Sequence, residues 1–486
     1  MMAQRLQAAY LPDIANQDVA WHVLQFGNAA HALEVALPQL SQLQLQAITR
    51  RVQEACQTQL KSMSVCDIVS AIDRAIAKLL DTSDPRRKLL DTVLPIISNM
   101  DKDLLQLSLS QYFKTFRALQ LHRFVAEDFA NPQILDAFQP RVTGGWSKAM
   151  GPDLAVHVWA GNVPALPLWS MVSGLLVKSG CIGKVSSAEP VFAAVFAEVL
   201  VEVEPRFKNC FAIIWWPNED TTTARYLFNQ AEVVVAYGAS TTLAVLQNQT
   251  PSATRFLAHG HKLSFGMVAM SALSVLRSKR VANEAALDVV RFEQQGCYSP
   301  HMFYVERGAK VSPYEFAEHL RSSIAAVAKK FPRPPLTLEE AASVVQWREK
   351  YALSMVQTSA TQVLGDATDA FTVVYSDTPI PLEAGPSNRC VVVVAVDKLT
   401  DVIPLLQRQK NYLQTVGLAV APEELLHLGD ALAQAGATRI CAIGNMCSPA
   451  AGWHHDGRFS LSDLVRLVDI EASTEIESER FTQYEL

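Results

Sequence analysis

Cys297 is the side chain of this sequence best placed for covalent chemistry. It follows Gly296 and precedes the turn-forming pair Ser299-Pro300, after which residues 302–305 resemble a strand. This layout predicts a thiol at the end of a structural element. A thiol so placed acts as a nucleophile when a neighbouring cation or a helix terminus lowers its pKa. A cysteine beside a glycine is also common in ordinary packing, so the motif needs support from the rest of the chain.

The segment Trp159-Ala-Gly-Asn162-Val-Pro164 is the second candidate, because it places an amide side chain at the end of an apolar run. No formal charge occurs between Asp153 and Lys178, a stretch long enough to span a bilayer. Prolines and a glycine interrupt this stretch. We therefore expect a buried strand, a turn and a helix over residues 168–178, and no membrane span.

The elements that hold these two segments are predicted to alternate between strand and helix. Apolar runs predict strands at residues 154–160, 182–185, 211–216 and 233–236. Helical spacing predicts helices at residues 168–178, 191–203 and 221–229. Alternation of this kind is typical of parallel βαβ units with buried strands.

A second alternating section follows, over residues 262–444. Its predicted strands are 302–305, 372–375, 390–396 and 439–443, and its predicted helices are 283–291, 313–330 and 338–353. Ahead of both sections, residues 29–127 are expected to be helical and to serve packing or a partner surface. Residues 131–151, rich in proline and glycine, suit a loop or hairpin, and 464–470 suit one more strand.

The composition is that of an ordinary, rather apolar globular protein, with 49% hydrophobic and 19% charged residues. Its length of 486 residues predicts two or three domains. The formal charge of -6 argues against nucleic acid as the main partner. The 8 cysteines form no CxxC pair and no secretory signal is evident, so we expect reduced thiols and a cytoplasmic location.

Several standard motifs are missing from the sequence. It has no GxGxxG, no Walker loop, no GxSxG elbow and no HExxH. Cys447 with His454-His455 fits no common zinc spacing, so we expect a polar loop there and no metal site.

Four short motifs in their order resemble the aldehyde dehydrogenase superfamily, and more closely the LuxC-type acyl-CoA and acyl-protein thioester reductases. They are Trp159-Ala-Gly-Asn162-Val-Pro164, Gly180-Cys-Ile-Gly-Lys184-Val-Ser-Ser187, Tyr237-Gly238-Ala-Ser240 and Gln295-Gly296-Cys297. The similarity runs from about residue 111 to 470. Reductases of this type supply fatty aldehyde in bacterial luminescence and also occur in non-luminous bacteria.

The resemblance implies an α/β fold of the aldehyde dehydrogenase type. A Rossmann-like cofactor domain would cover residues 111–260, with a return segment near 445–470. A second α/β domain, 261–444, would carry Cys297, and a helical region would cover residues 1–110. The segments 138–151 and 460–471 are expected to pair across subunits, because an open edge strand invites pairing. We therefore expect a homo-oligomer.

The resemblance also implies a reaction. Cys297, as thiolate, would attack an acyl thioester and release its thiol carrier. The acyl-enzyme would then take a hydride from a nicotinamide cofactor and give an aldehyde. Negative charge develops on the carbonyl oxygen, where the Asn162 amide and the backbone N–H of Cys297 would donate hydrogen bonds. Each such donor is typically worth roughly 3 kcal/mol.

The cofactor-binding residues follow from the same resemblance. Lys184 would meet the adenosine ribose, and the helix N-terminus between Gly238 and Ser240 would hold the pyrophosphate. Ser187 stands where relatives often carry an acidic residue that repels a 2′-phosphate, so we expect NADPH in preference to NADH. Glu383 falls where the superfamily touches the nicotinamide ribose, although a surface glutamate is an equal alternative.

One departure from the superfamily bears on the chemistry. Hydrolytic members carry a glutamate base in a Glu-Leu-Gly-Gly-Lys stretch, where this chain has Ala258-His259-Gly260-His261-Lys262. Without that base water is poorly activated, which favours reduction of thioesters over formation of acids. His261, or His259, is predicted to donate a proton to the leaving group. A structural role for these histidines is the alternative.

The favoured interpretation is an NADPH-dependent reductase acting on acyl-CoA or on an acylated protein. The resemblance implies that an acyl-protein synthetase is a candidate partner, because the luminescence members of the family bind one. Two other interpretations remain open. One is an aldehyde or semialdehyde dehydrogenase, which would share Cys297 and Asn162. The other is a non-catalytic scaffold that kept the fold. The loop Trp453-His-His-Asp456-Gly457 falls near the loop that closes over the active site in relatives, and we assign it no catalytic step.

Overall fold

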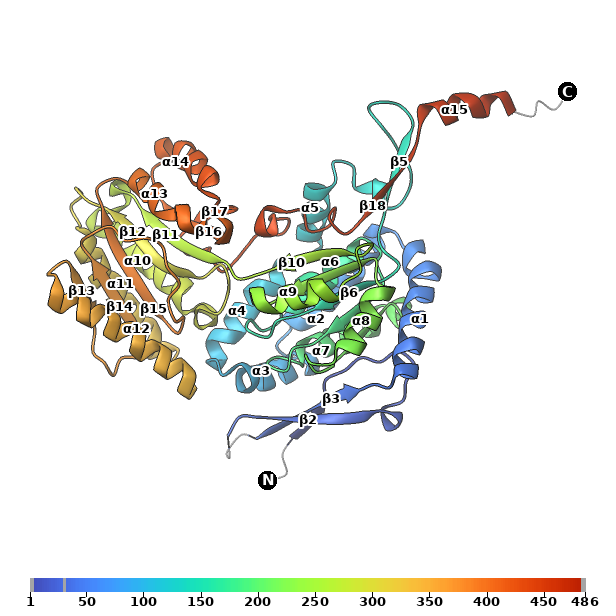
Figure 1. Ribbon diagram of the computed structural model, residues 1–486, viewed down its shortest axis with the longest axis horizontal. Coiled ribbons are helices and arrows are strands. Elements are labelled where there is room, and N and C mark those ends of the chain that lie inside the picture. Colours follow the sequence, from blue (N-terminus) through green and yellow to red (C-terminus); the bar gives the residue numbers. More distant parts are fainter. Residues whose placement is uncertain (1–3, 29–31, 482–486) are drawn as a thin grey trace.

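The computed structural model describes residues 4–28 and 32–481. Two α/β units lie side by side, each built on its own sheet (Figure 1). A small N-terminal sheet lies below the first unit, and an arm projects from the upper right of the same unit (Figure 1). The chain passes from the first sheet to the second between residues 259 and 263, and it returns after residue 442.

The first unit is a five-stranded parallel sheet in the order β10-β9-β6-β7-β8. Its strands are β6 (Ala155–Val158), β7 (Cys181–Lys184), β8 (Phe211–Ile214), β9 (Val233–Tyr237) and β10 (Arg255–His259). Its helices are α6 (Leu166–Leu176), α7 (Phe192–Val203), α8 (Thr221–Gln230) and α9 (Ser240–Gln249). From β6 the chain adds β7 and β8 on one side of the sheet, and it then adds β9 and β10 on the opposite side of β6. Their carboxyl ends therefore flank a switch point, where open α/β sheets bind ligands.

The second unit is a seven-stranded sheet in the order β13-β14-β15-β12-β11-β16-β17, parallel except for β13. Its strands are β11 (Leu263–Val268), β12 (Pro300–Glu306), β13 (Thr361–Leu364), β14 (Thr372–Ser376), β15 (Cys390–Val396), β16 (Leu413–Ala419) and β17 (Arg439–Ala442). Its longer helices are α10 (Val275–Val290), α11 (Pro313–Lys330), α12 (Leu338–Gln357) and α14 (Pro422–Ala435). Both faces of the central strands are buried, as the apolar runs predict.

The prediction of helix from residue 29 onward is wrong for its first part. Strands β1 (Gln4–Gln7), β2 (Ala20–Phe26) and β3 (Leu33–Gln39) form a sheet in the order β1-β3-β2. A short apolar run such as β3 is compatible with a helix or with a strand. It is a strand here because it pairs with β1 on one edge and with β2 on the other. The region 1–110 is thus not wholly helical.

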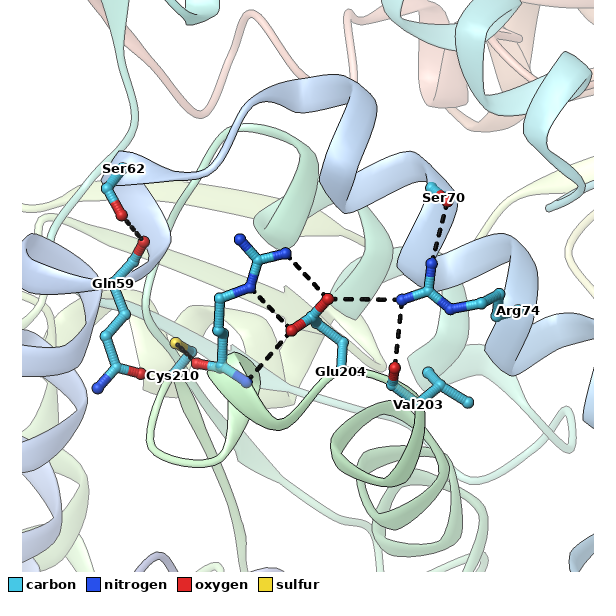
Figure 2. A network of polar contacts seen from close by, with 8 residues as sticks. Gln59, Ser62, Ser70, Arg74, Val203, Glu204 and Cys210 are labelled. Atoms are coloured by element: carbon cyan, nitrogen blue, oxygen red, sulfur yellow. Dashed lines mark hydrogen bonds and ion pairs between the residues drawn. The ribbon is translucent and has the colours of Figure 1, made fainter.

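Five helices follow the N-terminal sheet, as expected. They are α1 (Gln42–Thr58), α2 (Val65–Leu80), α3 (Pro85–Ser98), α4 (Lys102–Lys114) and α5 (Ala118–Asp128). Helix α2 packs against α7 of the first unit. Figure 2 shows a polar network at this contact, in which Arg74 donates to Glu204 and to the carbonyl of Val203. Glu204 also accepts hydrogen bonds from Arg206. No described helix is both long enough and apolar enough to cross a bilayer.

The arm is a three-stranded antiparallel sheet made within one chain. Strand β5 (Trp146–Met150) pairs with β4 (Gln139–Pro140) on one side and with β18 (Arg466–Ile470) on the other. The short helix α15 (Ala472–Ser478) continues beyond it (Figure 1). The hairpin and the last strand therefore pair with each other and do not need a second subunit for this pairing. The outer edges of β4 and β18 have no partner strand among the described residues.

Candidate active site

A cavity of about 560 Å³ lies where the two units meet. Its walls come from the turn after β6, the segment after β9, the crossing between β10 and β11, and the loop before β12. Asn162, Gly238, His261 and Cys297 all line it. The structure thus brings four of the sequence-predicted residues to one place, at the switch point of the first sheet.

Two unusual turns hold the segment that precedes Cys297. Residues 292–294 have φ of 51°, 51° and 60°, and residues 387–389 have φ of 58°, 56° and 66°. Left-handed backbone costs roughly 1–2 kcal/mol for each residue that is not glycine. The turns contact each other directly, since the Asn388 N–H donates to the Glu293 carbonyl (2.9 Å) and the Ser387 hydroxyl donates to the Gln294 carbonyl (3.2 Å).

A buried ion pair joins the two turns. The Arg389 guanidinium, which is 0% exposed, donates to both oxygens of Glu293, at 2.7 and 2.5 Å, and to the carbonyl of Phe331 at 3.0 Å. The side chain of Gln294 bonds the backbone of Cys390 in both directions, accepting at 2.8 Å and donating at 3.0 Å. These contacts offset the strain and fix the backbone only three residues before Cys297.

Cys297 is partly buried in the wall of the cavity. Burial first, and then the negative charge of Asp456, raise its pKa, which lies at about 11. Hydrogen bonds from the Gln414 side chain and from the N–H groups of Cys297 and Tyr298 lower it in part. No cation is among the groups that shift this pKa. A pKa raised in this way favours the protonated thiol at neutral pH, so a nucleophilic role for Cys297 would require a base.

Asn162 contacts the nucleophile segment from the opposite unit. Its Nδ2 donates to the backbone carbonyl of Gln295 at 2.7 Å. The carbonyl of Cys297 accepts from the Ser264 hydroxyl at 2.7 Å, which ties the same segment to β11. The amide thus contacts the residue two positions before Cys297, and its donor role toward an oxyanion remains a prediction.

The histidines of the crossing segment differ in how firmly they are held. His259 and His261 both line the cavity, but His261 is exposed. His259 is bonded through Nδ1 to Asp456 at 3.0 Å, and its ring contacts those of Tyr237 and His455, which also contact each other. His301, also in the wall, has its pKa lowered to about 4 by burial and by the neighbouring His261. Of the two predicted proton donors, His259 has the more defined geometry.

Sequence reasoning missed Gln414 and Asp456. Gln414 lies on β16, is 1% exposed, and donates to Asp456 at 2.7 Å. Asp456 belongs to the loop noted above for its place near the active site of relatives. The sequence pattern that could have indicated Gln414 is a polar amide within an apolar strand. Gln414 could be recognised as a site residue only once the position of β16 was known.

The predicted cofactor residues divide into two groups. Lys184 ends β7, with its Nζ bonded to Asn218 (3.0 Å) and placed over the ring of Trp216, and burial lowers its pKa to about 8. Gly238 lies in the cavity wall, and Ser240 is the exposed first residue of α9. Ser187 is exposed, and its hydroxyl accepts from the Trp215 indole at 3.0 Å.

A dinucleotide fits this edge of the first sheet. Gly161 has no room for a side chain, since a Cβ there would lie 2.7 Å from the Ser186 hydroxyl. Because Gly161 lies so close to Ser186, backbone rather than side chains lines this part of the crevice. Buried Lys184 forms no ion pair with another described residue. A lysine in that state suits an anionic or polyhydroxyl ligand.

Glu383 is not among the residues that line the cavity. Its carboxylate accepts from the Lys350 ammonium (2.7 and 2.9 Å) and the Tyr351 hydroxyl (2.5 Å), both on α12. Its neighbours Gly385 and Ser387 do line the cavity. A role for Glu383 at the nicotinamide ribose stays a prediction, and in this conformation α12 occupies its carboxylate.

Solved structures share this arrangement of sheets. Aldehyde dehydrogenase 21 from Physcomitrella patens superposes with a TM-score of 0.73 over 97% of this chain and 99% of its own, at 12% identity. The NADP-dependent glyceraldehyde-3-phosphate dehydrogenase from Bacillus halodurans superposes with a TM-score of 0.69 over 93% and 96%, at 11% identity. The chain therefore has the aldehyde dehydrogenase fold, which confirms the predicted fold class.

The sequence places the chain within a narrower group. The profile of the family described as "Acyl-CoA reductase (LuxC)" matches residues 60–467, and the chain belongs to this family. The long-chain acyl-protein thioester reductase of Photorhabdus laumondii is 26% identical over 378 residues, 75% of each chain. That of Aliivibrio fischeri is 28% identical over 360 residues, which are 72% of this chain and 70% of the relative. The predicted family is confirmed.

Proposed function

We propose that this protein reduces a long-chain fatty acyl thioester, carried by coenzyme A or by a protein, to the fatty aldehyde through an acyl-Cys297 intermediate, with NADPH as the reductant. One observation carries the choice of reduction over oxidation to an acid. None of the described residues that line the cavity is aspartate or glutamate, although the nucleophile and Asn162 are both there. Water in this cavity has no carboxylate base to activate it.

The chain's own residues supply the steps around the carbonyl. The sulfur of Cys297 attacks the thioester carbonyl, and the Asn162 amide and the Cys297 N–H donate to the oxygen that becomes negative. The tetrahedral species expels the carrier thiol and leaves the acyl group on Cys297. A bound NADPH supplies hydride to this carbonyl. The resulting thiohemiacetal then releases aldehyde and returns the sulfur of Cys297.

The walls of the cavity suit a long alkyl chain. Aromatic and aliphatic side chains from several elements surround the space next to Cys297. They are Tyr112, Leu166, Trp169, Phe292, Tyr298 and Trp453. Burial of each methylene of an acyl chain against such a surface contributes about 0.8 kcal/mol, so affinity should rise with chain length until the cavity is filled.

The preference for NADPH rests on the end of β7. Lys184 is buried there, and Ser187 stands at the position from which an acidic residue would repel a 2′-phosphate. Comparison of kcat/KM for NADPH and NADH tests this part alone. We expect at least a tenfold preference for NADPH, and a tenfold preference for NADH would overturn it.

Location and assembly complete the proposal. Every cysteine is a free thiol, which suits the reducing cytoplasm where we place the protein. The arm leaves strand edges open and exposes apolar side chains, namely Trp146, Leu467, Ile476 and Phe481. We propose that this surface joins subunits into a homo-oligomer. An acyl-protein synthetase is a further candidate partner, because the relatives are named for acyl-protein substrates.

The decisive experiment separates acylation from reduction. The protein is incubated with acyl-CoAs of increasing chain length without nicotinamide, and the peptide carrying Cys297 is examined by mass spectrometry. We expect an acyl adduct on Cys297 that disappears when NADPH is added, as aldehyde forms. Cys297→Ser should form neither adduct nor aldehyde.

The other outcomes point to the competing functions. Conversion of free aldehyde and NAD to acid, without an adduct from any thioester, would support an aldehyde dehydrogenase. An intact biological activity in Cys297→Ser would support a scaffold. Either result would refute the proposed reaction.

A further inference from the structure

Asp456 combines burial with a strained backbone. Its φ is 55° in the turn that follows His455, and its side chain is 7% exposed. Both carboxylate oxygens are used, since Oδ2 accepts from His259 Nδ1 at 3.0 Å and Oδ1 accepts from Gln414 Nε2 at 2.7 Å. Strain at a buried, fully bonded carboxylate is concentrated at functional sites, because ordinary loops avoid it.

His259 is held in one orientation by its neighbours. Its ring stacks on Tyr237 (centroids 4.7 Å apart, planes at 16°) and on His455 (4.4 Å, 18°). Among the contacts of the described residues, only Nδ1 of this ring is hydrogen-bonded. The bond to Asp456 uses Nδ1, so the second nitrogen, Nε2, is left without a partner among the described residues, on a residue that lines the same cavity as Cys297.

Gln414 acts on the same carboxylate and on the thiol. Its side chain donates to Asp456, and its contribution lowers the pKa of Cys297. Its Oε1 is buried and has no hydrogen-bond partner among the described residues. An unsatisfied buried acceptor is destabilising, so an amide at this place needs a reason beyond packing.

A metal ion is the competing use of this cluster. His259, His455 and Asp456 offer ligand atoms that all lie within 4.8 Å of one another. Imidazole binds a metal in the plane of its ring, at about 2.0–2.1 Å from the nitrogen. The two rings are stacked with their planes only 18° apart, so their lone pairs point alongside each other and not toward a common point. The geometry favours proton transfer over metal binding.

We propose that Asp456 is the positioning residue of this active site: it orients His259 as the base for the Cys297 thiol and holds Gln414 against the same sulfur. The inference rests on the proposed function and deepens it. His259 Nε2 accepts the thiol proton as the sulfur attacks the acyl carbonyl. The same nitrogen then gives this proton to the departing carrier thiolate, so His259 is neutral again when the acyl-enzyme is complete. After hydride transfer and release of aldehyde, the Cys297 thiolate takes one proton from water.

The pH dependence of thiol reactivity gives a direct test in the whole protein without acyl donor or cofactor. The titratable groups in contact with His259 are Tyr237 on β9 and His455 and Asp456 from the C-terminal loop. Cys297, His261 and Lys262 line the same cavity. Alkylation of Cys297 by iodoacetamide is followed by mass spectrometry as pH is raised. Without the base, thiolate forms only as pH approaches the raised pKa of the free thiol.

Asp456→Asn and His259→Gln are compared with His454→Gln as the matched control. His454 belongs to the same loop but packs on Phe459 and does not line the cavity. At neutral pH we expect alkylation about 100-fold slower in both test variants, within the usual contribution of a general base, and unchanged in the control. The rates should converge with wild type near pH 10, where the base is no longer needed.

A single-turnover measurement excludes a merely structural effect. Asp456→Asn should slow acylation of Cys297 by acyl-CoA, whereas reduction of the preformed acyl-enzyme by NADPH should proceed at the wild-type rate. Any slow hydrolysis of the acyl-enzyme without NADPH should also decline, since it draws on the same base. Thermal unfolding of each variant checks that the fold is retained, and His259→Gln provides the test should Asp456→Asn fail to fold.

Three results would overturn the inference. The first is an equal rate of Cys297 alkylation in Asp456→Asn and wild type at every pH. The second is a slower alkylation of the variant that persists at high pH. The third is reductase activity that a chelator removes and zinc restores. The proposed function fails separately, when wild type forms no adduct with any acyl-CoA. In that case the alkylation profile alone decides for or against the role of Asp456.

Discussion

Replacing Arg389 by methionine tests whether the buried ion pair holds the nucleophile segment in place. The change leaves Glu293, 7% exposed, as an unpaired charge among buried groups. Breaking a buried pair in this way is destabilising by about 3–5 kcal/mol. The two left-handed turns depend on the same contacts, so part of their strain is released when the pair is lost. We expect Arg389→Met to lower the free energy of unfolding by at least about 3 kcal/mol.

The double variant Glu293→Met/Arg389→Met makes the reasoning specific. Replacing both partners by apolar side chains removes the unpaired charge, and such replacements are often neutral or stabilising. The double variant should therefore be more stable than Arg389→Met, although it has lost more polar contacts. Non-additivity of at least about 2 kcal/mol is expected, because the two side chains touch.

The pH dependence of the single variant has a definite sign. Burial raises the pKa of Glu293 even in the presence of Arg389, and removal of the guanidinium raises it further. A group with a raised pKa in the folded state stabilises the fold below its unfolded pKa and loses that contribution as pH rises. The deficit of Arg389→Met relative to wild type should therefore shrink as pH falls from neutral toward the ordinary glutamate pKa.

Urea unfolding followed by tryptophan fluorescence measures these differences, and alkylation of Cys297 reports whether its segment has relaxed. Arg206→Met is the control, since Arg206 is 51% exposed and Glu204 keeps its bond to Arg74 (Figure 2). Exposed pairs contribute about 0–1 kcal/mol. A loss below about 1 kcal/mol in Arg389→Met, or additive losses in the double variant, would refute the assigned role of the pair.

Three further predictions concern the site and the assembly. Asn162→Ala should lower kcat about 10²–10³-fold, because one donor to the carbonyl oxygen and the bond to Gln295 are both lost; an unchanged kcat in single-turnover assays would argue against this role. Burial lowers the pKa of Lys184 to about 8, and this side chain should bind NADPH as a cation. The affinity for NADPH should therefore be constant at lower pH and fall up to about tenfold per pH unit above 8. Calorimetry in two buffers should show proton uptake on binding near pH 8, and the absence of proton uptake would contradict this role. Leu467→Lys, on the arm, should reduce the mass of the particle in light scattering while leaving the reactivity of Cys297 unchanged, and an unaltered mass would exclude the arm as the interface.

Local signals in the sequence were sufficient where each one agreed with the packing. Helix α11 begins and ends at the predicted residues, because Ser312 caps it, Pro313 occupies its first turn and Glu315 completes the capping box. Strand β15 also has its predicted bounds, since its continuous apolar run is buried on both faces. The order of the four motifs predicted the fold class and the family.

Strands β11 and β16 could not be predicted in this way, because glycines interrupt their apolar pattern. In β11, a Cβ on Gly266 would lie 2.3 Å from the ring of Phe303, and in β16 a Cβ on Gly417 would lie 2.6 Å from the sulfur of Met446. Each glycine is required by a side chain from another part of the chain. Local propensity disfavours glycine in a strand, and only tertiary packing explains it here.

The cluster around Asp456 was hidden for a related reason. His259 and Asp456 are 197 residues apart, and Gln414 comes from a strand whose position was not predicted. No spacing rule connects residues that meet only when the chain returns from the second sheet toward the arm. The sequence indicated a histidine for proton transfer, but the choice between His259 and His261 needed the carboxylate that orients one of them.

The division of these residues between the two units has a consequence for catalysis. Asn162 and His259 belong to the five-stranded unit, whereas Cys297 and Gln414 belong to the seven-stranded unit. Under the proposed mechanism, the thiol would be activated only while the two units keep their relative position, and the bond from Asn162 to the Gln295 carbonyl spans this contact directly. A substrate that separates the two units would move the base away from the thiol. A substrate that holds the two units together would favour activation of the thiol. Binding of the acyl chain in the shared cavity and activation of Cys297 are thus expected to be linked.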